Sequence, residues 1–491
     1  MLLANISEDY KNFLKKIAIA LGIFAAVRLF VPAGHGLTTN GVTVLAAFMA
    51  TIYLWIFVAT DWPSFLAPAL FITLGILPQG EMLAFAFGNM AVAYVLATSL
   101  ISVALQRTGV IRQTALWFMT QKICEGRPWM FVGMFLLSVT FLGLFLDIVP
   151  VVLVFLVMAD DVCKRLGYEK GSRFGQALVF GILVLTAVTF GATPISHIVP
   201  FIFIGFMHDA GFPITFGQYM AVGIPLTIAA YIIVMCVLML IVRPDFSNFQ
   251  KHGIDELRQE LKPFDIEAKT TIMVFILVII AWLMPDLGML FAPSLAEWFR
   301  RTGMVAPAIL GVVALALIRV KDDKPIVNIR EDIFKVPLGV IVFIIGVQTF
   351  ANTINSPAAG ITVFLSNVFQ PLADAMSPTM FVWVVIFITI LFTQTLSNIV
   401  LQAILWFTFL PVLLSLNVYG EVINIMAFGV ILSLTINIAF VLPSSQVCAP
   451  MAFGSGYLEV KHGVKYGMPV VIAIYFVMML LCWPLALLVT R

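Results

Sequence analysis

Apolar runs of membrane-spanning length recur along the whole chain, separated by short polar segments. A helix that crosses a hydrocarbon core about 30 Å thick needs roughly 20 residues, because it rises about 1.5 Å per residue. The pattern predicts nine helices that cross alone or tilted, at residues 14–31, 41–58, 64–78, 88–106, 217–242, 269–285, 303–319, 335–351 and 465–488. The chain is therefore predicted to be an all-α, polytopic membrane protein.

Four further apolar segments carry polar residues or chain breakers near their middle. Residues 128–159 and 378–416 begin near a proline and hold polar side chains halfway along. Residues 174–206 and 421–457 are interrupted by FGATPISH (190–197) and LPSSQVCAP (442–450). Unpaired backbone groups cost several kcal/mol in hydrocarbon, so such breaks must be buried in protein or line a wet cavity.

The positions of the basic residues predict which loops share a side of the membrane. If the N-terminus is cytoplasmic, 23 of the 27 Lys and Arg residues fall on the inside, in segments 1–16, 107–127, 160–173, 243–269, 319–335 and 458–465. This asymmetry follows the positive-inside rule. It holds only if 128–159 and 378–416 each enter and leave on one side, so both are predicted to be re-entrant hairpins. With two broken helices, the total is about 11 membrane helices.

Composition excludes a soluble protein. Of the 491 residues, 62% are hydrophobic and only 11% are charged, whereas soluble domains are about a quarter charged. The five cysteines form neither a CxxC pair nor a Cys/His cluster, so we expect no zinc site. The polar N-terminal segment lacks the apolar core and cleavage site of a signal peptide, so we expect residue 1 to remain.

The chain reads as two similar halves. VGIPLTIAAYIIVM (222–235) matches YGMPVVIAIYFVMM (466–479), including Gly223 with Gly467 and Tyr231 with Tyr475. The spacing from hairpin tip to break also repeats, at 44 residues from Asp147 to Gly191 and 45 from Asn398 to Pro443. Because the charge pattern makes the halves face opposite ways, this is the inverted-repeat plan of many secondary transporters. The predicted division is an N-terminal segment and first helix (1–40), a first repeat (41–242), a cytoplasmic linker (243–268) and a second repeat (269–491).

The hairpin tips supply the first candidate site residues. In the second tip, TQTLSNIVLQ (393–402), hydroxyl and amide groups come from Thr393, Ser397, Asn398 and Gln402. In the first tip, GLFLDIVP (143–150), Asp147 lies among apolar residues. An acid inside a membrane segment is costly and is a functional hypothesis by default. Asp147 could bind a cation, take up a proton, or pair with a helix end or a distant Lys.

The two breaks supply the remaining candidates. The first break contributes Thr193, Ser196 and His197, and the second contributes Ser444, Ser445 and Gln446. Half-helix N-termini favour anions, and unwound carbonyls with helix C-termini favour cations such as Na⁺. The four interruptions together predict a site for a small, anionic solute and a coupling cation. Walker, GxSxG, HExxH and dinucleotide motifs are absent from any usable context, so ATP-driven transport and standard hydrolytic chemistry are not expected.

These motifs resemble the divalent anion:sodium symporters, the dicarboxylate, citrate and sulfate transporters of the ion-transporter superfamily. The resemblance covers nearly the whole chain. It rests on the two hairpins, on FGATPIS, on PLGVIVFIIG (337–346) and on LPSSQVCAPMAFGSGYL (442–458). The family's Ser-Asn-Thr triplet at each tip is replaced here by Leu146-Asp147-Ile148 and Ser397-Asn398-Ile399. Thr193 and Pro194 keep the family pattern, whereas Gln446 replaces a threonine.

The resemblance also implies residue roles and an assembly. Asp147 and Ala192 would lie at one sodium site, and a second would use Thr393, Leu396, Asn398 and Ser445. The solute would contact the tips, including Ile399, together with Thr193, Pro194 and Gln446. The carboxylate of Asp147 would either strengthen the first sodium site or convert it to proton binding. A homodimer is implied, in which the hairpins and broken helices move against a scaffold as an elevator.

The expected function is secondary active transport of a small organic anion of the carboxylate type, coupled to Na⁺ or H⁺ and needing no other cofactor. An inorganic-ion antiporter of the Na⁺/H⁺ type is the alternative, and a membrane-embedded enzyme or sensor is a remote one. The expected partners are the anion, the lipid bilayer and a second copy of the chain, with no nucleic acid. The expected location is a bacterial inner membrane.

Overall fold

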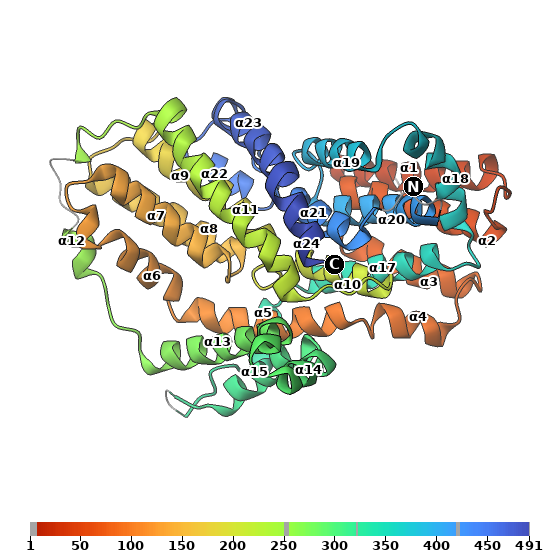
Figure 1. The fold of residues 1–491 in the computed structure, drawn as a ribbon, viewed down its shortest axis with the longest axis horizontal. Coiled ribbons are helices and arrows are strands. Elements are labelled where there is room, and N and C mark those ends of the chain that lie inside the picture. The colour runs from red at the N-terminus through yellow and green to blue at the C-terminus, as the bar shows by residue number, and fades with distance from the viewer. Residues whose placement is uncertain (1–6, 250–254, 321–322, 419–422, 491) are drawn as a thin grey trace.

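The computed structural model describes residues 7–249, 255–320, 323–418 and 423–490, and within them every regular element is a helix (Figure 1). Seven stretches there are long and apolar enough to cross a membrane. They are α2 (Thr39–Phe57), α4 with α5 (Gln79–Ala86, Met90–Arg107), α9 (Arg173–Ala192), α11 (Phe216–Val237, continued by a π-helical turn to Val242), α13 (Ile266–Leu287), α17 (Leu338–Asn355), and α23 with α24 (Val460–Val477, Trp483–Val489). The prediction of an all-α polytopic membrane protein is confirmed.

The predicted span at 64–78 is wrong. The chain there forms a 3₁₀ turn, Trp62–Phe65, and the eight-residue helix α3 (Leu66–Thr73). Gly75 then adopts a left-handed conformation with φ of 66°, and Pro78 precedes the next helix, α4. The crossing predicted at 88–106 starts earlier in consequence, because α4 leads into α5.

Two other predicted spans, 14–31 and 303–319, differ from the structure. Helix α1 (Glu8–Phe30) is long enough to cross, but Lys15, Lys16 and Arg28 exclude it from the candidate spans. The predicted helix 303–319 is α15 (Val305–Leu317), preceded by the amphipathic α14 (Pro293–Thr302) at an angle of 83°. If that bent pair counts as one span, the described residues hold eight candidates, and the other apolar helices there are shorter, at 10–17 residues.

Both predicted hairpins are helix–turn–helix units. The first is α7 (Pro128–Gly143) with α8 (Ile148–Arg165), and the second is α19 (Pro378–Phe392) with α20 (Asn398–Val418). Rings at similar distances from each turn face one another, Phe135 with Phe155 at 5.4 Å and Phe381 with Phe409 at 5.8 Å. The two helices of each hairpin therefore run antiparallel.

Both predicted breaks interrupt helices in the structure. The first separates α9 from α10 (Ile198–Asp209), and the second separates α21 (Ile425–Ile436) from the short α22 (Ala449–Gly454). Residues 421–422 of the predicted second broken helix lie outside the described residues. Smaller elements are α6 (Val110–Met119), α12 (Asp255–Gln259), α16 (Ile329–Asp332) and α18 (Ile361–Asp374).

Matched tyrosines make matched contacts in the two halves. Tyr231 on α11 donates to the carbonyl oxygen of Gly133 at 2.9 Å, and Tyr475 on α23 donates to that of Trp383 at 3.2 Å. Gly133 and Trp383 are each the sixth residue of the first helix of their hairpin. The sequence repeat is thus a repeat of tertiary contacts as well.

Matched glycines pack against the break of their own half. A Cβ on Gly223 would lie 2.0 Å from the Ala192 carbonyl oxygen, and one on Gly467 would lie 3.2 Å from the Val441 side chain. Glycine lets α11 approach the backbone at the end of α9, and lets α23 approach the side chain of Val441.

The two repeat-related helices, α11 and α23, lie side by side and run in opposite directions (Figure 1). Near the start of α11, Gln218 donates to the carbonyl oxygen of Val489, close to the chain end. Near the end of α11, Arg243 lines a pocket with Lys465, close to the start of α23. This antiparallel pairing is what an inverted repeat requires.

The basic segments predicted to share one side do contact one another. Glu260 of the linker accepts hydrogen bonds from Arg112 after α5 and from Arg165 at the end of α8. These two guanidinium groups, Arg112 first, hold the pKa of the Glu260 carboxyl below its usual value. Tyr457 likewise donates to Asp160 at 3.0 Å.

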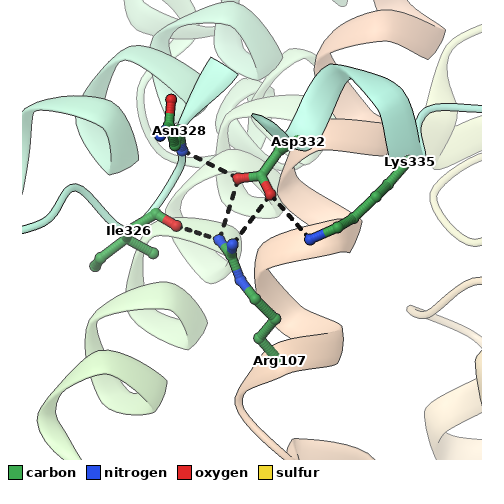
Figure 2. Close-up of polar contacts among 5 residues, drawn as sticks. All are labelled: Arg107, Ile326, Asn328, Asp332 and Lys335. Carbon is green, nitrogen blue, oxygen red and sulfur yellow. Dashed lines mark hydrogen bonds and ion pairs between the residues drawn. The ribbon is translucent and has the colours of Figure 1, made fainter. Parts of the chain in front are cut away.

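A buried ion pair adds the segment 319–335 to this side (Figure 2). Asp332 is fully buried and pairs with Arg107 at the end of α5 at 3.0 Å and with Lys335 at 3.3 Å. It also accepts from the backbone N–H of Asn328 at 3.0 Å, while Arg107 donates to the Ile326 carbonyl oxygen. A buried carboxylate is tolerated here because two cations and a backbone donor surround it.

Candidate functional site

The four interruptions, two tips and two breaks, meet in the interior of the protein. The Thr193 hydroxyl in the first break donates to the Leu144 carbonyl oxygen of the first tip at 2.6 Å. The Thr393 hydroxyl in the second tip donates to the Ile436 carbonyl oxygen at the end of α21. A Cβ on Gly191 would lie 2.4 Å from that of Asn437, so the breaks touch each other. Segments far apart in sequence thus gather as predicted.

The first tip, residues 144–147, presents a carboxylate. Asp147 is exposed and caps α8, because its side chain accepts from the backbone N–H of Val149 at 3.0 Å. A carboxylate at a helix N-terminus is stabilised by the helix dipole. Helix α22, which follows the second break, packs against α8, whose N-terminus Asp147 caps. The first tip therefore faces the second break as well as the first.

The first break is held on both sides. Thr193 and Ser196 are buried, with their hydroxyl oxygens 3.0 Å apart. The Pro194 carbonyl oxygen accepts from the hydroxyl of Tyr94 on α5 at 3.0 Å. His197 is half-buried and stacks on Phe190, with ring centroids 3.2 Å apart. The His197 side chain makes no capping hydrogen bond to the N-terminus of the 12-residue α10.

The second tip, residues 393–397, is fastened by a residue that sequence reasoning missed. Gln394 is buried, and its amide nitrogen donates to the Ile390 and Ile438 carbonyl oxygens. Its amide oxygen accepts from the backbone N–H groups of Phe440 and Val441, both at 3.2 Å. The signal was present in the sequence, because Gln394 lies between two threonines of an apolar segment.

The other residues of the second tip differ in how open they are. Thr393 is buried, and its hydroxyl oxygen, which donates to Ile436, also lies 3.2 Å from the Asn398 side-chain oxygen. Ser397 is exposed, and Leu396, Asn398 and Ile399 are half-buried. Ala192, the other residue of the predicted sodium sites, is buried, and its carbonyl faces Gly223.

Gln402 lies behind the second tip and not among the open groups. It is fully buried and donates to the Val199 carbonyl oxygen on α10 at 2.9 Å. Its amide oxygen accepts from Ser433, which is also 3.0 Å from the hydroxyl of Tyr219. Tyr219 in turn donates to the Gly191 carbonyl oxygen at 2.9 Å. In this structure Gln402 joins α20 to α10 and α21.

The second break, residues 437–448, holds unpaired amide atoms. Ser444 is exposed, and buried Ser445 donates to the Leu442 carbonyl oxygen at 2.7 Å. The Gln446 amide nitrogen and the Asn437 amide oxygen are buried without a hydrogen-bond partner. Buried polar atoms are normally paired, so these two are available to a ligand. The described residues contain no group of three His, Cys, Asp or Glu that could hold a metal ion.

Interrupted helices that meet at a common interior site are typical of many secondary transporters. The chain belongs to the family described as the sodium:sulfate symporter transmembrane region, whose model matches residues 11–489. The resemblance inferred from the motifs is thereby confirmed, and the chain is a secondary transporter and not an enzyme.

One solved structure supports the fold. The crystal structure of the Alcanivorax borkumensis YdaH transporter aligns with a TM-score of 0.54 over 91% of this chain and 98% of that one. The sequence identity is 11%, so the likeness concerns the fold alone. No curated protein matches the chain in sequence.

Proposed function

We propose that the protein moves a small anion, of the organic carboxylate type, across the membrane in company with Na⁺ or H⁺. The observation that carries the proposal is the meeting of all four interruptions, with two buried amide atoms left unpaired beside them. A polar site enclosed by apolar helices is costly unless a ligand uses it.

The anion would bind where positive partial charge is available. The N-terminus of α10 has no side-chain cap, and helix N-termini attract anions through their free N–H groups. The unpaired amide nitrogen of Gln446 adds a donor. The exposed Ser397 and Ser444 and the half-buried Asn398 and His197 complete the proposed solute-contacting set, with Thr193, Pro194 and Ser196 holding the first break in shape.

The coupling ion would bind beside the tips. The exposed carboxylate of Asp147 offers a charge that either pairs with Na⁺ or takes up a proton, next to the backbone around Ala192. A second cation would use oxygen atoms around Thr393, Leu396, Asn398 and Ser445. Both sets consist of carbonyl, hydroxyl, amide and carboxylate oxygens, which suit hard cations.

The proposed movement is that of an elevator within a homodimer of a bacterial inner membrane, with the N-terminus cytoplasmic. The hairpins and broken helices are joined by the contacts described above, and α9 is buried among them from Phe174 to Ala192. This packing supports the proposal that they move as one unit. The gathering of the basic segments on one side supports the orientation.

Uptake into proteoliposomes tests the proposal. Radiolabelled di- and tricarboxylates and sulfate are offered with an inward Na⁺ gradient, an inward H⁺ gradient or neither. We expect gradient-driven uptake of at least one anion, and we expect Asp147→Asn to change the ion dependence. Asp323→Asn, the same chemical change at an exposed loop residue, is the control. Unchanged ion dependence in Asp147→Asn would refute the role given to this acid.

The Asp147 carboxylate also favours a second candidate, an inorganic-ion antiporter. A titratable group at a hairpin tip can exchange H⁺ for Na⁺ without any organic solute. Proton flux measured with a pH-sensitive dye, under a Na⁺ gradient and without carboxylate or sulfate, separates the two functions. Flux under these conditions favours the antiporter, and its absence together with anion uptake excludes it.

A further inference from the structure

Three cationic side chains converge on one pocket at the end of α11. The pocket has a volume of about 330 Å³ and is lined by Arg173 at the start of α9, Lys465 and Tyr466 near the start of α23, and residues 240–243. Arg173, Arg243 and Lys465 are all exposed. None of the described residues that line this pocket is acidic.

Among the described residues, none of the three cations forms an ion pair. Of the nearest acids along the chain, Glu459 pairs with Lys461 at 2.7 Å. Asp245 accepts hydrogen bonds from Ser247 at 2.9 and 3.0 Å, and among the described residues neither Asp245 nor Glu169 forms an ion pair with one of the three cations. Like charges that share a small pocket repel one another. Their convergence without a protein counter-charge indicates that an anion from outside the chain neutralises them.

The backbone and one hydrogen bond fix the position of the Arg243 side chain. Arg243 has a left-handed conformation with φ of 51°, directly after the π-helical turn Leu238–Val242. Helices often end at a residue in this conformation, and the Arg243 N–H here caps the turn by donating to the Leu238 carbonyl oxygen. One guanidinium nitrogen, Nε, donates to the Leu240 carbonyl oxygen at 2.8 Å. This bond fixes the side chain and leaves its two terminal nitrogens for a ligand.

The surroundings fit the boundary of a membrane. Leu240 is 66% exposed and lies beside the cations. The pocket mouth therefore presents an exposed apolar side chain next to cationic groups. The pocket lies on the side where the basic segments gather, which is the predicted cytoplasmic side. Basic pockets between membrane helices on that side bind the head groups of anionic lipids.

We propose that this pocket binds a phosphate-type anion, held by Arg173, Arg243 and Lys465, and that this site is separate from the transport site. The anion could be a phospholipid head group or free phosphate. Either would join the end of α11 to the starts of α9 and α23, the helices that lead to or pack against both breaks. The inference does not depend on the identity of the transported solute.

The test is lipid and phosphate binding to the purified full-length protein. Retention of lipid by native mass spectrometry and the thermal midpoint are measured in phosphatidylcholine, with added phosphatidylglycerol or inorganic phosphate. We expect one of these additions to raise the midpoint by a few degrees. Each charge removed, in Arg243→Gln or Lys465→Gln, should weaken apparent affinity about fivefold, and the double variant about 25-fold. Lys465→Arg should retain binding.

The matched control is Lys461→Gln, on the same helix one turn earlier. Lys461 is already neutralised by Glu459, so this variant should bind as the wild type does. A response to the lipid alone identifies the head group as the ligand, and a response to phosphate identifies the free anion. Asn398→Ala should keep either response, because it alters the transport site only. The proposal is overturned if neither addition binds, or if the double variant and Lys461→Gln lose binding equally.

Discussion

The two hairpin tips have similar shapes, but the side chains that fasten them come from different segments. In the second half, the tip supplies the side chains, since Thr393 and Gln394 bind backbone groups at and after the end of α21. In the first half, the break supplies the side chain, since Thr193 reaches the Leu144 carbonyl oxygen. The first turn, 144–147, is also one residue shorter than the second, 393–397. The repeat therefore preserves geometry, whereas the atoms that satisfy the broken backbone differ.

This difference leaves the first tip with few fastening side chains and one carboxylate. Asp147 needs only the Val149 N–H as a capping partner, so its second oxygen can serve an ion. The second tip uses its polar side chains partly for structure. We expect substitutions there to cost more stability than those at the first tip.

The largest effect is expected for Gln394→Leu. This change leaves the Ile438 carbonyl and the Phe440 and Val441 N–H groups without partners, and each buried unpaired group costs about 1–3 kcal/mol. We expect a loss of about 3 kcal/mol or more, with loss of transport, measured by tryptophan-fluorescence melting and uptake. Thr395→Val is the control, because this exposed hydroxyl bonds only within its own turn. Equal losses of stability in the two variants would contradict the structural role that we give to Gln394.

A second substitution tests whether the breaks must touch. A Cβ on Gly191 would overlap Asn437, and overpacking typically costs about 1–3 kcal/mol. We expect Gly191→Ala to lower the melting temperature and to reduce uptake, since it separates the halves at the site. Gly22→Ala on α1 is the control, because no atom lies within 4 Å of its added Cβ. A normal uptake rate in Gly191→Ala would show that contact between the breaks is dispensable.

Thr193→Val should have a smaller effect than Gln394→Leu. It removes the bonds to Leu144 and Ser196, which we expect to cost about 1–2 kcal/mol in the same melting assay. Thr186→Val is the matched control, because this buried hydroxyl bonds only within α9. If Thr193→Val proved more damaging to stability than Gln394→Leu, the contrast between the tips would be reversed.

The smallest change in stability is expected for Ser397→Ala. The hydroxyl is exposed, and an exposed substitution usually changes stability by less than about 0.5 kcal/mol. If Ser397 contacts the solute, KM for uptake should rise several-fold while the melting temperature stays unchanged. An unaltered KM would place Ser397 outside the solute site and would leave the second tip with a structural role only.

The sequence alone determined the class of fold and predicted which interrupted segments lie together. Apolar runs bounded by basic loops can be satisfied only as membrane helices, so composition and charge predicted a polytopic protein whose basic segments share one side. The Gly-Pro-Ser interruptions at 190–197 and 442–450 had to be enclosed, because hydrocarbon does not tolerate unpaired backbone. The matched pair Tyr231 and Tyr475 indicated a repeat, which their contacts with Gly133 and Trp383 bear out.

Only the tertiary structure decided which polar groups fasten the site and which are open to a ligand. Gln394 and Gln402 look alike in sequence, as amides of one apolar hairpin, yet both are occupied by backbone carbonyls. The amides of Asn437 and Gln446 retain unpaired atoms. Likewise, 64–78 has the hydropathy of a span but turns at Gly75. Hydropathy records how apolar a segment is, whereas the partners of its polar atoms depend on elements brought close from more than 40 residues away.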